Sequence, residues 1–129
     1  MSLNLVNNES YEMVPEKTGT FTPNFTIDEY GNPSIFEVKQ VGNVVYMTGF
    51  LQIDGTWTDL LGGPLGTITG VDAPKSPSSS YIPVITMDNN AVMHNGYIRP
   101  YYSNGDIKLS AELNAADIMI FINGFYFTA

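Results

Sequence analysis

The segment around Trp57 places an aromatic ring between two carboxylates. Asp54 and Asp59 bracket Trp57 in a stretch that otherwise holds glycine and threonine. An indole ring can stack on the apolar face of a sugar, while carboxylates accept hydrogen bonds from its hydroxyl groups. Asp54, Trp57 and Asp59 are therefore candidate saccharide-binding residues. Two carboxylates could also flank a glycosidic bond or hold calcium, but the spacing and terminal Glu of a calcium loop are absent. In the simplest alternative, the acids lie in a solvated loop and Trp57 caps the core.

A second candidate group surrounds Asn104-Gly105, a dipeptide typical of two-residue type I′ hairpin turns. In the simplest register of this hairpin, Arg99 faces Ser110 and Tyr101 faces Lys108. One face then carries Tyr97, Arg99, Tyr101 and Lys108, and the opposite face carries Ile98, Pro100, Ile107 and Leu109. Arg99, Tyr101 and Lys108 form an aromatic and basic strip that suits a phosphorylated or acidic glycan. The same strip could instead be a half-exposed face held by cation–π pairs, or a subunit contact.

The sequence offers little support for catalysis. His94 is the only histidine, so any Ser-His-Asp arrangement would have to use it. Its place before Asn95-Gly96 favours a surface position at the end of a strand. The glycine-rich residues 62–66 lack the Lys-Ser or Lys-Thr of a phosphate-binding loop, and the chain contains no cysteine. We therefore expect no catalytic residues, no metal site and no cofactor, and we do not expect an enzyme.

Composition narrows the classes of partner. A chain of 129 residues, 43% of them hydrophobic, is long enough for one domain with a proper core. Charged residues make up only 14%, against about 25% in an average soluble protein. The net charge is −8, and five Lys and Arg residues cannot supply the broad basic surface that nucleic acid requires. No apolar run approaches the roughly 20 residues of a membrane span, so we expect no membrane insertion.

The pattern of turns and apolar residues predicts a single all-β domain. Residues 1–18 are mostly polar and aperiodic and are interpreted as a linker or joint, which leaves 19–129 as the domain. Residues 34–41 and 44–54 form the clearest antiparallel pair, connected by Gly42-Asn43, with Phe36 opposite Gly49. One face of this hairpin is a core face. The other carries Tyr46 and Phe50, which predicts a second packing surface.

The remaining elements are short. We expect strands over 19–27, 65–69, 81–87 and 91–94, and one helical turn is conceivable over 111–117. The closing strand, residues 118–128, has apolar residues on both faces and is predicted to be buried on both. Several short strands separated by turns every eight to twelve residues indicate an antiparallel β-sandwich of jelly-roll type.

The order of these elements resembles the head domains of phage tail-fibre tips and baseplate receptor-binding proteins. The resemblance rests on the hairpin over 38–49, the proline-bearing stretch over 77–83, the Asn104-Gly105 hairpin, and the aromatic and Thr-rich closing strand over 122–128. It spans residues 34–129. It implies a β-sandwich head, usually a homotrimer, that binds cell-surface saccharide. The collagen-like or coiled shaft that often precedes such heads is not present in this sequence.

The resemblance leads to a functional hypothesis. The chain is expected to be a phage or prophage tail-tip domain that binds host saccharide without cleaving it. It would be made in the host cytoplasm and act on the virion tail, as a homotrimer beside other tail or baseplate proteins. Two alternatives stay open: a structural connector of a baseplate or fibre, and a carbohydrate-binding module of a bacterial secreted protein.

Overall fold

The computed structural model describes residues 15–24, 35–52, 64–76, 81–113 and 117–128. In these segments the chain forms only β-strands: β2 (Glu16–Pro23), β3 (Ile35–Val41), β4 (Val44–Gln52), β5 (Gly66–Thr69), β6 (Ile82–Asp88), β7 (Met93–Ser103), β8 (Asp106–Glu112) and β9 (Asp117–Phe127). Every strand pair is antiparallel. The all-β prediction is therefore confirmed. The described segments contain no helix that could span a membrane.

The hairpin of β3 and β4 has the register that the sequence predicts. Val41 pairs with Val44 and Phe36 pairs with Gly49. Gly42, the first residue of the two-residue turn, has a φ of +62°. Phe36 lies opposite Gly49 and packs edge-on against Phe21, with ring centroids 5.1 Å apart.

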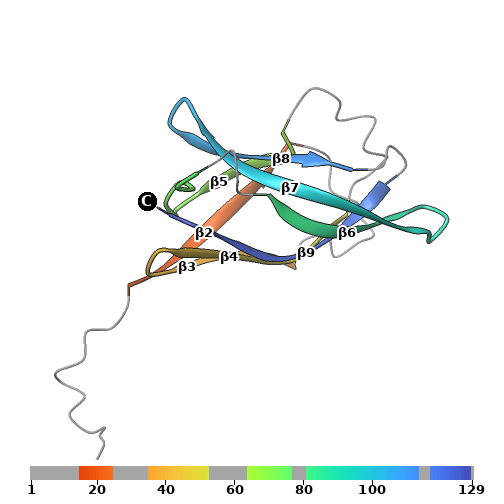
Figure 1. Ribbon diagram of the computed structural model, residues 1–129, viewed down its shortest axis with the longest axis horizontal. Helices are drawn as coiled ribbons and strands as arrows, with labels where there is room; N and C mark the ends of the chain where they lie inside the picture. The colour runs from red at the N-terminus through yellow and green to blue at the C-terminus, as the bar shows by residue number, and fades with distance from the viewer. Residues whose placement is uncertain (1–14, 25–34, 53–63, 77–80, 114–116, 129) are drawn as a thin grey trace, which may run out of the picture.

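The eight strands close into a barrel in the order β2-β3-β4-β9-β6-β7-β8-β5, so the predicted sandwich is wrong. Closure depends on β2, whose residues 16–19 pair with β3 and whose residues 20–23 pair with β5. Figure 1 shows β2 running obliquely between the β3–β4 side and the β5 side of the molecule. An alternation of inward and outward residues suits a sandwich and a barrel equally. The pairing of β2 with β5 decides between a sandwich and a barrel, and no local sequence pattern predicts that pairing.

Two glycines let β2 approach both of its neighbours. A Cβ added to Gly19 would lie 2.8 Å from Cγ1 of Val38 in β3. A Cβ added to Gly66 of β5 would meet the carbonyl oxygen of Thr22 in β2. Any larger residue at either position would push β2 away from a strand that it must pair with, so these glycines serve the closure of the barrel.

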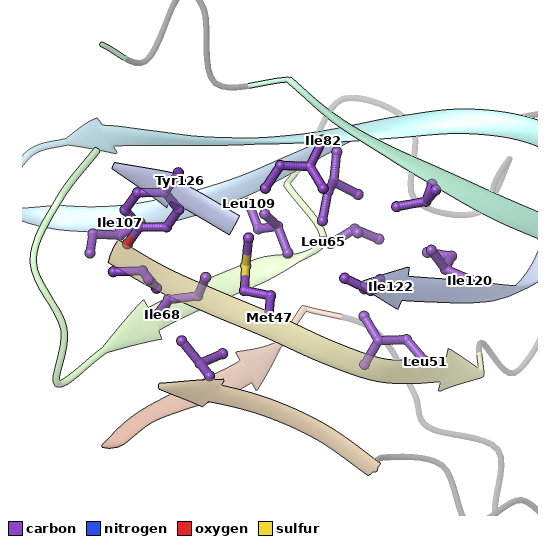
Figure 2. Packing of buried hydrophobic residues seen from close by; sticks show 14 residues of the cluster. Met47, Leu51, Leu65, Ile68, Ile82, Ile107, Leu109, Ile120, Ile122 and Tyr126 are labelled. Carbon is purple, nitrogen blue, oxygen red and sulfur yellow. The ribbon is translucent and has the colours of Figure 1, made fainter. Parts of the chain in front are cut away.

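The interior of the barrel is filled by side chains. Figure 2 shows the core, which Met47 and Leu51 of β4 share with side chains from β5, β6, β8 and β9. An eight-stranded barrel has an interior just wide enough for its side chains to fill. The buried hydrophobic residues are Val38, Val45, Met47, Leu51, Leu65, Ile68, Ile82, Val84, Ile98, Ile107, Leu109, Ile120, Ile122 and Tyr126.

Hydrogen bonds around Asp72 close one end of the barrel. The buried Gln40 side chain donates to the Asp72 carboxylate at 2.9 Å and accepts from the Asp72 amide at 2.8 Å. Tyr126 donates its hydroxyl to the Asp72 carbonyl at 2.6 Å, and burial raises the pKa of Tyr126. These bonds tie the segment after β5 to β3 and β9.

Several sequence-based boundaries differ from the structure. β2 begins at Glu16, inside the range assigned to the linker, and it pairs with a neighbouring strand on both sides. Ala111 and Glu112 extend β8, so the conceivable helical turn is wrong there. β7 is one continuous strand from Met93 to Ser103, which joins two elements that the sequence separated at Asn95-Gly96.

The closing strand β9 is buried on one face only within this chain. Ile120, Ile122 and Tyr126 point into the core, while Phe121, Phe125 and Phe127 are exposed. Tyr46 on β4 is also 46% exposed, and Phe50 is half-buried. The predicted double burial is therefore wrong for the single chain, since no other element of the described chain covers this outer face.

Candidate functional site

The three residues around Trp57 lie outside the described residues. Asp54, Trp57 and Asp59 belong to the segment 53–63, between β4 and β5. Their role as a saccharide site stays a prediction. The geometry of a candidate site comes instead from the second group, on the outer face of β7 and β8.

The β7–β8 hairpin has the predicted register and turn. Arg99 pairs with Ser110 and Tyr101 pairs with Lys108. Asn104 and Gly105 have φ angles of +53° and +87°, as a type I′ turn requires. The apolar face points inward as predicted, with Ile98, Pro100, Ile107 and Leu109 all buried.

Two tyrosine rings hold the guanidinium group of Arg99. Its central carbon lies 5.5 Å from the ring centroid of Tyr101 and 5.8 Å from that of Tyr81. Both distances are within the range of a cation–π interaction. Among the described residues, none accepts a hydrogen bond from the Arg99 guanidinium. The two ring contacts thus orient the planar guanidinium of Arg99. Its N–H donors, which no described residue uses, can then face an anionic or hydroxylated ligand.

Sequence reasoning missed Tyr81. It directly precedes β6, and its neighbour Ile82 pairs with Ile98 of β7. This pairing brings Tyr81 beside Arg99, although 18 positions separate them in the sequence. The only signal in the sequence was the aromatic residue at the start of a predicted strand, and the neighbouring strand could not be deduced from it.

A carboxylate and a phenol complete the cleft. Tyr97 donates its hydroxyl to Oε2 of Glu112 at 2.9 Å, and this bond, together with desolvation, raises the pKa of Tyr97. The rings of Tyr81 and Tyr97 meet edge to face, 5.1 Å apart. Tyr81, Tyr97, Arg99, Ser110 and Glu112 line a shallow cleft of about 140 Å³. The cleft therefore combines the cationic donors of Arg99 with the acidic acceptor of Glu112.

Lys108 is only partly available to this site. Its ammonium group lies 3.4 Å from the Thr67 hydroxyl of β5 and 3.9 Å from the Asp106 carboxylate. Lys108 therefore extends the strip beyond Tyr101, while the cleft itself is formed around Arg99.

His94 contacts Asp88 near the turn between β6 and β7. Its Nε2 lies 3.2 Å from Oδ2 of Asp88, whose other carboxylate oxygen accepts hydrogen bonds from the amides of Asn90 and Val92. These contacts, the Val92 amide first, lower the pKa of Asp88. The pair thus organises the turn between β6 and β7. The described residues include no cluster of three His, Asp or Glu side chains suited to a metal ion.

Comparison with known proteins gives no relative from which a role could be inferred: no protein-family model, curated protein or solved structure matches this chain. The geometry around Arg99 is therefore the main guide to function.

Proposed function

We propose that this chain is a phage or prophage tail-tip domain that binds an acidic host saccharide without cleaving it. The domain would act on the virion tail, next to other tail or baseplate proteins. The observation that carries the proposal is the Arg99 guanidinium, which lies over the rings of Tyr81 and Tyr101 and donates no hydrogen bond to any described residue. Aromatic rings beside a free cation suit the combined apolar and anionic surface of an acidic sugar. The resemblance to receptor-binding heads rests on the order of elements in the sequence alone, because the eight strands close into a barrel and not into the sandwich that it implied.

The exposed aromatic face of β4 and β9 supports a homotrimer as part of this proposal. Tyr46 and Phe125 lie 6.2 Å apart between ring centroids, and Phe50 and Phe121 lie 6.4 Å apart. Exposed apolar side chains grouped on one face are a common mark of a protein interface. We place the subunit contact on Tyr46 and Phe50 of β4, and Phe121 and Phe125 of β9 lie outside it. The same patch favours the second candidate function, a structural connector that only holds neighbouring subunits.

Binding to purified bacterial surface polysaccharides would test the proposal. The wild-type protein should bind acidic polysaccharides. Arg99→Ala should weaken this binding by about tenfold or more, because a hydrogen bond to a charged group contributes about 1.5–3 kcal/mol. Arg99→Lys should recover little, since an ammonium group lacks the planar face and forked donors of guanidinium. Lys39→Ala is the matched control, because it removes an exposed cation on β3.

Two results would contradict the proposal. If no acidic polysaccharide binds the wild-type protein, the connector role becomes the better explanation. If Arg99→Ala and Lys39→Ala bind as wild type does, the saccharide site lies elsewhere, with Trp57 as the next candidate.

A further inference from the structure

A long groove lies on the outside of the barrel between β6 and β9. The two strands pair only from Ile85 to Asp88, where Ile85 faces Phe121, and they do not pair beyond this point. β9 stays paired with β4 as far as Phe127. The space left between β6 and the last half of β9 has a volume of about 870 Å³, several times that of the cleft at Arg99.

Proline at position 83 explains why the pairing stops. Continuing the register would place Pro83 opposite Asn123, but proline has no N–H to donate to a neighbouring strand. Ile82 instead packs over the backbone of Gly124, where an added Cβ would meet the Ile82 Cγ2 methyl. Ile82 and Gly124 therefore form the floor of the groove, and the space above them is open.

The open pairing leaves backbone groups of β9 without partners among the described residues. The Thr128 amide donates to Asn43 on the β4 side, and the Phe127 carbonyl accepts from the Lys75 amide on the other side. Because successive residues of a strand direct these groups to opposite sides, those of Asn123 and Phe125 point toward β6. No described residue hydrogen-bonds to them. The groove thus presents main-chain donors and acceptors along its length.

The walls of the groove combine aromatic rings with amide side chains. Phe121, Phe125 and Phe127 form one wall, and Tyr81 and Ile85 stand on the other. Phe125 is 52% and Tyr81 is 51% exposed. The amides of Asn95 and Asn123 are exposed in the same groove and have no hydrogen-bond partner among the described residues.

From this combination we propose that the groove binds a linear acidic oligosaccharide along β9. Sugar rings offer apolar faces that stack on the aromatic walls, and their hydroxyl groups both donate to and accept from the free amide and backbone groups. An apolar protein segment would cover the same rings but leave the Asn95 and Asn123 amides buried without partners, which is costly. The chemistry of the groove therefore favours a saccharide over a second protein chain.

The groove and the Arg99 cleft share a wall. Tyr81 lines both, and Lys75 stands at the rim of the groove. Two of the five Lys and Arg residues in a chain of net charge −8 thus border this continuous surface. Residues 121–127 of β9 extend over about 20 Å, enough for several sugar units. The inference rests on the proposed saccharide function and extends it: Arg99 takes an acid group, and the groove takes the chain attached to that group.

A series of acidic oligosaccharides of increasing length would test this inference. The probes are fragments, from disaccharide to octasaccharide, of the acidic polysaccharide that wild type retains, with affinities measured by calorimetry. Wild-type affinity should rise with length until the groove is filled. Two variants alter opposite walls: Phe125→Ala removes a stacking ring, and Ile85→Glu adds a negative charge. Both should bind the disaccharide as wild type does but lose about tenfold or more on the longest fragment.

Tyr102→Ala is the matched control, because Tyr102 is an aromatic residue on β7 that is 57% exposed and lies outside the groove. It should leave the whole length series unchanged. The inference is overturned if affinity does not depend on length, or if both wall variants retain the wild-type series. It is also overturned if Phe125→Ala and Ile85→Glu dissociate an oligomer, since the groove would then be a subunit contact. Failure of every acidic polysaccharide to bind wild type would instead refute the proposed function itself, whereas failure of the fragments alone would overturn the groove.

Discussion

Replacing Gly124 with alanine tests the closed floor of the groove. The added Cβ would overlap Cγ2 of Ile82, so one of the two strands must shift. Ile82 is β-branched and 3% exposed, and its χ1 has little freedom in a packed strand. Gly124 itself does not require a positive φ angle, so the expected cost is steric.

The expected loss of stability in Gly124→Ala follows from the cost of overpacking a filled site. Inserting one methyl group into a well-packed site costs about 1–3 kcal/mol, so we expect Gly124→Ala to lower the free energy of unfolding by about 2 kcal/mol. For a domain of this size, each kcal/mol corresponds to about 4 °C in Tm. Thermal denaturation followed by circular dichroism should therefore show a loss of about 8 °C.

A second substitution makes the test specific. Ile82→Ala removes the clashing Cγ2 methyl and should cost about 2–5 kcal/mol alone, through loss of burial and creation of a cavity. In the double variant the alanine methyl at position 124 occupies part of that cavity. Its total loss should thus be smaller than the sum of the two single losses by about 1–2 kcal/mol.

Ile82→Val provides the matched control, because valine keeps the Cγ2 position and lacks only the terminal methyl. It should not relieve Gly124→Ala, and those two losses should add within about 0.5 kcal/mol. Additive losses for Ile82→Ala with Gly124→Ala would refute the reasoning, as would a Gly124→Ala variant with the wild-type Tm. Either result would mean that Ile82 does not pack on Gly124.

Three further outcomes are expected. Gly105→Val should lower the free energy of unfolding by about 1 kcal/mol or more, because a φ of +87° disfavours a β-branched residue; an unchanged Tm would contradict the type I′ turn. The hydrogen bonds to Asp88 lower its pKa in the folded protein. They therefore stabilise the fold at a pH above the ordinary carboxyl range, and this stabilisation is lost as the pH falls through the lowered pKa of Asp88. Wild type should therefore lose more Tm than Asp88→Asn between about pH 7 and pH 3, and parallel losses in the two proteins would refute this role. Trp57→Ala should weaken adhesion to host cells while the Tm and the oligomeric state stay unchanged; intact adhesion with a large loss of Tm would make Trp57 a core residue.

Local patterns predicted the β3–β4 and β7–β8 hairpins but only half of the candidate site. The register of β7 and β8 follows from the turn at Asn104-Gly105, so the sequence alone could place Arg99 and Tyr101 on one outer face. Tyr81 could not be placed there, because its position depends on the pairing of β6 with β7. The groove could not be foreseen either. It results from the end of a pairing between β6 and β9, two strands far apart in the chain.

The sequence by itself determined the class of the fold, the two hairpin registers and the inward face of each. These properties depend on residues close in the chain, where alternating side chains and turn glycines act directly on the backbone. The tertiary structure decided that the sheet closes, because β2 must find both β3 and β5, and the glycines that permit this act only once those strands meet. It also decided that β9 keeps an exposed aromatic face and an open groove. Burial on the second face of a strand depends on what the rest of the chain can reach, and no alternation of residues in β9 reports it.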